Sequence, residues 1–200
     1  MKPMNSLVAL GAAAVLMGSG LIATPASAAT TSVQDELAKN GGTIEIVAAG
    51  ESKTLEISPR KVETQKKTPV PYCGYKGSSQ THVKTYTRAG LEDLGGHTAN
   101  LRCGSYGKGG WGLRHIGENH KGDWANKAGG NDWFDMMEFA TKQTLKKPKS
   151  AIRQGNDTHN YCAPVQLKYN GKTYDKFLTN VPVSHVGKNI ITSFPAKACK

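Results

Sequence analysis

Several motifs that mark large enzyme classes are absent from this sequence. It has no glycine-rich phosphate loop for ATP, no dinucleotide-binding fingerprint and no exposed-thiol catalytic signature. Beyond its first residues it also lacks an apolar run of the roughly 20 residues that a membrane span needs. These absences exclude three large enzyme classes and predict a soluble product with no stable membrane insertion.

Cysteine is scarce, and no two cysteines are closely spaced. The four are Cys73, Cys103, Cys162 and Cys199. In an exported chain an even number of cysteines predicts disulfides, here two bonds with three possible connectivities that the sequence does not separate. Structural zinc is the competing interpretation, but it usually needs a Cys-x2-Cys pair, which is missing. We therefore expect disulfides, with no metal and no other cofactor.

The N-terminal residues have the pattern of a secretory signal peptide. Lys2 precedes an apolar run over residues 7–22, and small residues follow at 26–28. This order of charge, apolar run and small-residue cleavage site predicts removal of residues 1–28, with Ala29 as the first mature residue. The expected location is secreted and extracellular.

The formal net charge of +11 at pH 7 is unevenly distributed. Residues 29–58 are acidic, and nearly all basic residues follow them. Such an excess favours polyanionic partners, which include nucleic acid, anionic lipid and acidic wall polymers. The alternative is an exported protein whose surface is merely basic.

The acidic segment 29–58 contains the pattern of a small β-hairpin. Apolar residues alternate over 43–47 and again over 53–58, as in paired half-buried strands. The hairpin is expected either to cover the basic domain as a strand pair or to act as a propeptide. Residues 59–71 are basic and bounded by prolines, which predicts a linker. The basic, cysteine-bearing domain would then span residues 72–200.

One helix is strongly indicated over residues 132–146. Asn131 is a suitable N-cap, lysines lie at the far end, and Pro148 prevents continuation. Residues at three- and four-residue spacing predict a buried face, namely Trp133, Met136, Met137, Ala140 and Thr144. A shorter helix is expected through Leu91 and Leu94, capped by Thr87.

The C-terminal part is predicted to form strands. Segments 165–169 and 172–178 flank Asn170-Gly171, a strong two-residue hairpin signal, and further strands are expected over 181–186 and 189–194. The expected fold is therefore α+β, with N-terminal helices packed on a C-terminal antiparallel β-meander and disulfides as staples. Helix 132–146 is the expected cover of one sheet face.

The segment 111–124 is the densest in acid–base groups. Between two tryptophans it contains Arg114, His115, Glu118, His120, Lys121 and Asp123. Two imidazoles beside cations can move protons at neutral pH while they hold an anion such as a phosphodiester. On one straight helix residues five apart would point about 140° apart. Gly112, Gly117 and Gly122 also argue against one unbroken helix. We therefore expect a short helix that runs into a turn, which would let both rings meet; ordinary surface or packing histidines are the alternative.

Three features together resemble the exported toxin nucleases that share the barnase, EndoU, colicin D and RelE fold. The first is Arg-His-Ile-x-x-x-His at 114–120, and the second is the order of helices before a C-terminal sheet. The third is a last strand ending Ile-Ile-Thr-Ser-Phe-Pro at 190–195. The resemblance covers about residues 110–195, and each motif alone is weak.

The resemblance implies metal-independent RNA cleavage by attack of a ribose 2′-hydroxyl. His115 and His120 would transfer protons, and the last-strand hydroxyl would come from Thr192 or Ser193. The phosphate would contact a cation, for which the candidates are Arg114, Lys121 and Lys188. His159 and His185 are alternatives to His120. The expected partners are RNA and an acidic immunity protein, and the chain is expected to be monomeric.

Two other functions compete with this interpretation. A metal-dependent His-Asn-His nuclease would use His120, Asn131 and His159, but their spacing is poor and the start of that motif is missing. A non-catalytic binder would use the basic surface for wall polymer, lipid or protein, with Trp111 and Trp124 as stacking platforms unless they are buried.

Overall fold

The computed structural model describes residues 26–59, 70–74, 77–90, 96–130, 132–155 and 157–200. Its helices are α1 (Ala26–Asn40), α2 (Gly112–Asn119), α3 (Lys121–Ala128) and α4 (Trp133–Lys146). Its strands are β1 (Gly42–Ala48), β2 (Glu51–Ile57), β3 (His82–Thr87), β4 (Thr98–Arg102), β5 (Ser150–Gln154), β6 (Thr158–Tyr169), β7 (Lys172–Ser184) and β8 (Phe194–Ala196). The predicted α+β class is confirmed.

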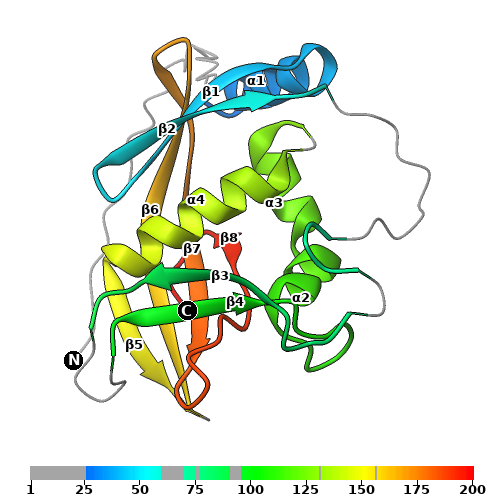
Figure 1. Ribbon diagram of the computed structural model, residues 1–200. Helices are drawn as coiled ribbons and strands as arrows, with labels where there is room; N and C mark the ends of the chain where they lie inside the picture. Colours follow the sequence, from blue (N-terminus) through cyan, green and yellow to red (C-terminus); the bar gives the residue numbers. More distant parts are fainter. Residues whose placement is uncertain (1–25, 60–69, 75–76, 91–95, 131, 156) are drawn as a thin grey trace, which may run out of the picture.

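The main sheet is organised around one long strand, β6. The sheet order is β2-β1-β6-β7-β8, with β5 also on β6, and every pairing is antiparallel. The first half of β6 pairs with β5 and its second half with β1 on the same edge. A second, two-stranded sheet of β3 and β4 lies in front of the main sheet (Figure 1).

The predicted hairpin at Asn170-Gly171 is confirmed and joins β6 to β7. Asn170 and Gly171 have φ values of 50° and 74°, as a two-residue type I′ turn requires. The separately expected strands 172–178 and 181–186 are one continuous strand, β7. Thr179 and Asn180 interrupt the apolar pattern, but both are buried and paired with β6, so the ladder continues through them.

Helix α4 crosses one face of the main sheet, as expected (Figure 1). All five residues of the predicted face are buried, namely Trp133, Met136, Met137, Ala140 and Thr144. Asp132 is the N-cap, and its carboxylate accepts a hydrogen bond from the Ser58 N–H at 2.7 Å. Asn131, the expected cap, lies outside the described residues. The hydrogen bond joins the start of α4 to the end of β2.

The acidic hairpin is part of the main sheet. β1 and β2 pair as the sequence predicts, and β1 also pairs with β6 from Glu45↔Lys168 to Ala48↔Val165. Ile44, Ile46 and Leu55 lie in the same core as α4. The hairpin is therefore built into the main sheet. Helix α1, which precedes it, was not expected from the sequence.

The expected order of elements is only partly confirmed, and two further expectations are wrong. Strands β1 to β4 come before α2, so only part of the helix-before-sheet order is confirmed. Thr87 is the last residue of β3 and caps no helix, because its backbone is extended and pairs with Thr98; Leu91 and Leu94 lie outside the described residues. The last strand begins at Phe194, although Ile190 forms a single bridge with Val183.

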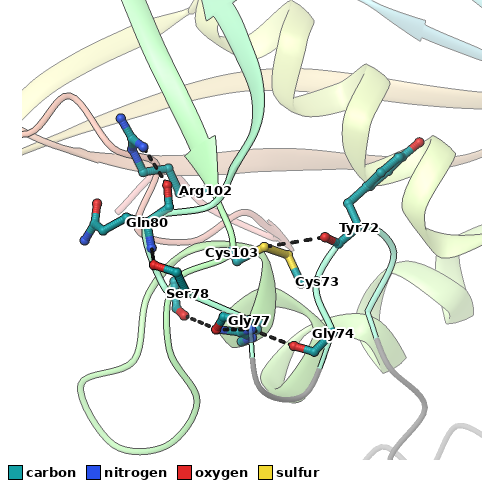
Figure 2. Close-up of a disulfide and its surroundings, with 10 residues drawn as sticks. Tyr72, Cys73, Gly74, Gly77, Ser78, Gln80, Arg102 and Cys103 are labelled. Atoms are coloured by element: carbon teal, nitrogen blue, oxygen red, sulfur yellow. Dashed lines mark hydrogen bonds between the residues drawn. A yellow bond between two sulfur atoms is a disulfide. The ribbon is translucent and has the colours of Figure 1, made fainter.

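Two disulfides join Cys73 to Cys103 and Cys162 to Cys199. The first connects the segment before β3 to the end of β4, where Arg102 donates to the Gln80 carbonyl at 2.7 Å (Figure 2). The second fixes the C-terminal residues to β6. Among the described residues, no helix is both long and apolar enough to cross a membrane.

We expect Ile46→Ala to lower the free energy of unfolding by about 2–5 kcal/mol, because it leaves a cavity in the shared core. Ile46 is 0% exposed and pairs with Leu167. Urea denaturation of the purified protein measures the effect, with the half-buried neighbour Val47→Ala as the control. An unchanged midpoint for Ile46→Ala would mean that the hairpin is a detachable cover.

Candidate functional site

The two central histidines lie at the junction of two short helices. α2 ends and α3 begins at His120, whose φ of −128° and ψ of 0° are not helical. Its N–H still donates to the Ile116 carbonyl at 2.8 Å, and its carbonyl accepts from the Trp124 N–H at 3.1 Å. One residue thus closes the first helix and opens the second.

Core packing fixes both helices on either side of this junction. Helix α2 buries Leu113 and Ile116, and α3 buries Trp124. The start of α2 also requires glycine, since Gly112 has a φ of +74° and a Cβ there would lie 2.6 Å from the Arg102 carbonyl oxygen. The Gly112 N–H donates to the Ile191 carbonyl at 2.8 Å. The helix pair is therefore anchored to the segment just before β8.

The junction brings the two imidazoles together. The ring centroids of His115 and His120 are 5.9 Å apart, with an edge-to-face angle of 69°. Both rings are half-buried. A continuous helix would have pointed them about 140° apart. The expected short helix followed by a turn is present, and it produces the convergence.

His115 is held by its neighbour one turn later. The Asn119 side-chain amide Nδ2 lies 3.1 Å from His115 Nδ1 and 3.2 Å from the His115 carbonyl oxygen. A carbonyl oxygen accepts only, so Nδ2 is the donor, and His115 Nδ1 must then also accept. The hydrogen of a neutral His115 ring is therefore on Nε2.

The pKa of His115 is lowered from its ordinary value of 6.5. Burial is the main cause, and the neighbouring His120 is the second, because each disfavours a positive charge on the ring. The carboxylate of Glu118 opposes both. His115 is therefore poised to stay neutral under conditions in which an ordinary histidine is partly charged.

His120 has a different set of contacts. Its ring stacks on Phe194 of β8, with centroids 5.0 Å apart and an angle of 22°. Its Nδ1 lies 3.0 Å from the Asp123 carboxylate, one helical turn later. A carboxylate accepts, so Nδ1 carries the hydrogen and Nε2 keeps its lone pair. Both imidazoles therefore leave Nε2 available, as a hydrogen-bond donor on His115 and as an acceptor on His120.

The two hydroxyl candidates lie just before β8 and differ in environment. Ser193 is fully buried, its hydroxyl is 2.7 Å from that of Thr141, and its carbonyl accepts from the Trp124 indole N–H. It therefore holds the core together. Thr192 is 8% exposed, and its hydroxyl has no hydrogen-bond partner among the described residues. The Thr192 hydroxyl oxygen is itself buried, so in this structure neither hydroxyl is open to a ligand.

The three residues expected to contact phosphate lie in different environments. Arg114 is buried, and its guanidinium donates to the carbonyls of Gly74, Gly77 and Gly104, so it ties loops together. Lys121 is the first residue of α3, directly after His120. Lys188 lies in the turn after β7, where its carbonyl accepts from the Asn100 N–H. Arg114 and Lys121 both adjoin a histidine of the pair in the chain, but the Arg114 guanidinium is committed to loop carbonyls.

The remaining histidine candidates form a second pair. His159 and His185 stack with their ring centroids 5.5 Å apart, at the paired ends of β6 and β7. His159 is buried, at 1% exposure. They contact each other, whereas His120 contacts His115 and Phe194. This arrangement gives His120 a place in the candidate site that neither of them shares.

Sequence reasoning missed several residues of this site. Phe194 supports His120, and the ammonium of Lys200 lies 4.9 Å from the Phe194 ring centroid. Asn119 and Asp123 orient the imidazoles, and their i+4 and i+3 spacing from the histidines was the available signal. Phe194 and Lys200 are brought in by tertiary contacts, for which the sequence had no local signal.

The described residues contain no group of three or more His, Cys, Asp or Glu side chains that could hold a metal ion. Trp124, one of the two proposed stacking platforms, is fully buried, and Trp111 is half-buried.

No family model, curated protein or solved structure matches this chain. The site must therefore be interpreted from its own geometry.

We expect the pKa of His115 to lie below 6.5 when its ring protons are titrated by NMR, with His82 as an exposed reference. His120→Ala should raise the pKa of His115, because the electrostatic effect of the His120 ring lowers it. Glu118→Gln should lower the pKa of His115 further, because the Glu118 carboxylate raises it. Because the folded state binds this proton less readily, the contribution of His115 to stability is complete above the unfolded pKa. It declines as the pH falls through the folded pKa. A His115 pKa at or above 6.5 would contradict this electrostatic description.

Proposed function

We propose that this protein is a secreted, metal-independent endoribonuclease. The observation that carries the proposal is the pair of imidazoles, 5.9 Å apart, at the helix junction beside β8. Two histidines in reach of one phosphodiester can remove one proton and supply a hydrogen bond or a proton elsewhere on it. The overall charge of +11 favours a polyanionic substrate.

In the proposed reaction the ribose 2′-oxygen attacks the adjacent phosphorus. Its proton passes to Nε2 of His120, and the bond from phosphorus to the 5′-oxygen breaks. The leaving oxygen then takes this proton from the His120 imidazolium, which returns to its neutral form, while the Nε2–H of neutral His115 donates a hydrogen bond. The products are a 2′,3′-cyclic phosphate end and a 5′-hydroxyl end. All atoms are supplied by the RNA and the two histidines, so no cofactor is needed.

The hydrogen bonds of the site assign different roles to the two rings. His120 donates from Nδ1 to Asp123, so its Nε2 lone pair is the proposed base. His115 accepts at Nδ1 from Asn119, so its Nε2–H is the proposed donor toward the phosphate or the leaving oxygen. Asp123 and Asn119 are positioning residues, because they act through the imidazoles.

Negative charge develops on the phosphate oxygens during attack, and nearby cations or donors would stabilise it. The proposed cations are Lys121, which follows His120 in the chain, and Lys200, which lies over the Phe194 ring. Thr192 is left out, because its hydroxyl is buried. We leave Arg114 and Ser193 out of the proposed mechanism, because both are committed to buried structural hydrogen bonds.

The biological setting is proposed from charge and cysteine use. Two disulfides fit an oxidising, extracytoplasmic environment. A secreted enzyme that cuts RNA would suit a role as an antibacterial toxin, and its basic surface would suit inhibition by an acidic immunity protein. A non-catalytic basic protein that binds wall polymer, lipid or a protein partner is the alternative.

We expect His115→Ala and His120→Ala each to reduce cleavage of total RNA by about 100-fold or more, because each removes a proton-transfer or donor group. Excess chelator should leave the wild-type rate unchanged. The exposed His82→Ala is the matched control and should keep full activity. Intact RNA in the presence of the wild-type protein, with binding that weakens as salt rises, would select the non-catalytic alternative.

We expect Asp123→Asn to slow cleavage by on the order of 10-fold or more, because an amide can favour the other tautomer of His120. Nitrogen-15 NMR of the imidazoles reports the tautomer directly: the wild type should show hydrogen on Nδ1 of His120 and on Nε2 of His115. Asp135→Asn, an exposed carboxylate of α4, is the control. A loss of rate with both tautomers unchanged would assign Asp123 some other role.

A further inference from the structure

A hollow of about 400 Å³ lies beside the histidine pair. Helix α3, the middle of β7 and the residues around β8 form its walls. The side chains that give it chemical character are Asp123, Lys127, Asp175, Lys176, Phe177 and Lys197. Its volume falls within the range of small-ligand sites, so it can hold a unit the size of one nucleotide.

Two residues connect this hollow to the histidines. Asp123 lines it and also accepts the hydrogen bond from His120. Pro195 lines it and directly follows Phe194, on which the His120 ring stacks. Helix α3 and β8 pack against each other, which brings these walls together (Figure 1). A chain bound at the histidines would therefore continue into the hollow.

The floor of the hollow is fixed by existing contacts. The Lys127 ammonium lies 2.8 Å from an Asp175 carboxylate oxygen and 5.1 Å from the centre of the buried Phe177 ring. The other Asp175 oxygen accepts the Lys176 N–H at 2.8 Å. Lys127 and Asp175 therefore neutralise each other, and neither is a strong site for a bare anion.

The rim has a different character. The side chains of Lys176 and Lys197 are exposed, and neither has an ion pair within the described part of the chain. Free ammonium groups can bind a phosphate of single-stranded RNA. The carboxylates of Asp123 and Asp175 would repel phosphate but can accept hydrogen bonds from ribose hydroxyls or base amino groups. Ammonium groups at the rim and carboxylate acceptors within the hollow match a nucleotide better than a lone phosphate.

We propose that this hollow binds the nucleotide adjacent to the scissile bond. Its phosphate lies on Lys176 and Lys197, and its sugar or base lies against Asp175. The proposal rests on the ribonuclease function and adds a substrate subsite to it. Two further hollows in the described part of the chain lie between β3 and α4, where Lys84 pairs with Glu138, and their linings share no residue with the histidine pair.

The test measures binding separately from cleavage. In the His115→Ala/His120→Ala background, fluorescence anisotropy follows a short fluorescein-labelled RNA of mixed sequence at increasing salt. Lys176→Ala/Lys197→Ala should weaken binding by about fivefold or more and reduce the slope of log affinity against log salt by about 1. Lys142→Ala/Lys147→Ala removes the same charge from the distant end of α4 and should change affinity by less than about twofold.

A competition experiment identifies the class of ligand. Mixed nucleoside 5′-monophosphates should displace the RNA from the protein with intact Lys176 and Lys197 at concentrations where inorganic phosphate does not. Equal displacement by both would show a simple anion site and overturn the nucleotide assignment. Equal weakening by the two lysine pairs would show general charge attraction and overturn the subsite.

The two proposals fail in different ways. If the wild type cuts no RNA but binding still depends on Lys176 and Lys197, the ribonuclease function is wrong and the nucleotide site remains. If the wild type cuts RNA and Lys176→Ala/Lys197→Ala leaves the RNA affinity measured by anisotropy unchanged, the ribonuclease function remains and the subsite is wrong. Cleavage rates of dinucleoside monophosphates, whose only phosphate is the scissile one, compared with longer RNA give a second readout. Only the longer substrate has a phosphate for these lysines, so only its cleavage should be slowed by Lys176→Ala/Lys197→Ala.

Discussion

The burial of Trp124 is the constraint on which the candidate site depends. Its ring is 0% exposed, meets Phe177 edge to face, and donates its indole hydrogen to the Ser193 carbonyl. This contact fixes α3 against β7 and the segment before β8, while the Gly112 N–H fixes α2 to the same segment at Ile191. With both helices held, the chain must bend at His120, and the bend turns its ring toward His115.

Polar groups near this bend are divided by burial. Buried Arg114 donates to backbone carbonyls and buried Ser193 is hydrogen-bonded to Thr141, whereas the buried Thr192 hydroxyl has no partner among the described residues. Burying such groups unpaired would be costly, so their hydrogen bonds serve the fold. The half-exposed imidazoles retain a nitrogen each that the described contacts do not use. Chemistry is therefore concentrated where the core ends and the surface begins.

The C-terminal residues are also held in place for this site. Cys199 is bonded to Cys162 of β6, and the buried side-chain amides of Asn160 and Asn180 donate to the Lys200 and Ala198 carbonyls. The tail thus keeps the Lys200 ammonium over the ring of Phe194. A disulfide and two amides give the last residue a defined position.

The sequence alone determined the local features, because each depends on neighbours in the chain. Residue spacing was enough for α4 and its buried face, for the β1–β2 hairpin, and for the turn at Asn170-Gly171. The α+β class followed from these elements, and the short helix that turns at His120 followed from the arithmetic of helical spacing.

Only the tertiary structure decided which nearby polar residues face the site. The same motif contains Arg114 and His115, yet one is buried under loops and the other meets His120. Phe194, Lys200 and the walls of the nucleotide-sized hollow come from segments far along the chain, and local patterns carry no information about such contacts. Strand β7 runs unbroken through Thr179 and Asn180 for a similar reason: pairing with β6, and not the apolar pattern, sets its length.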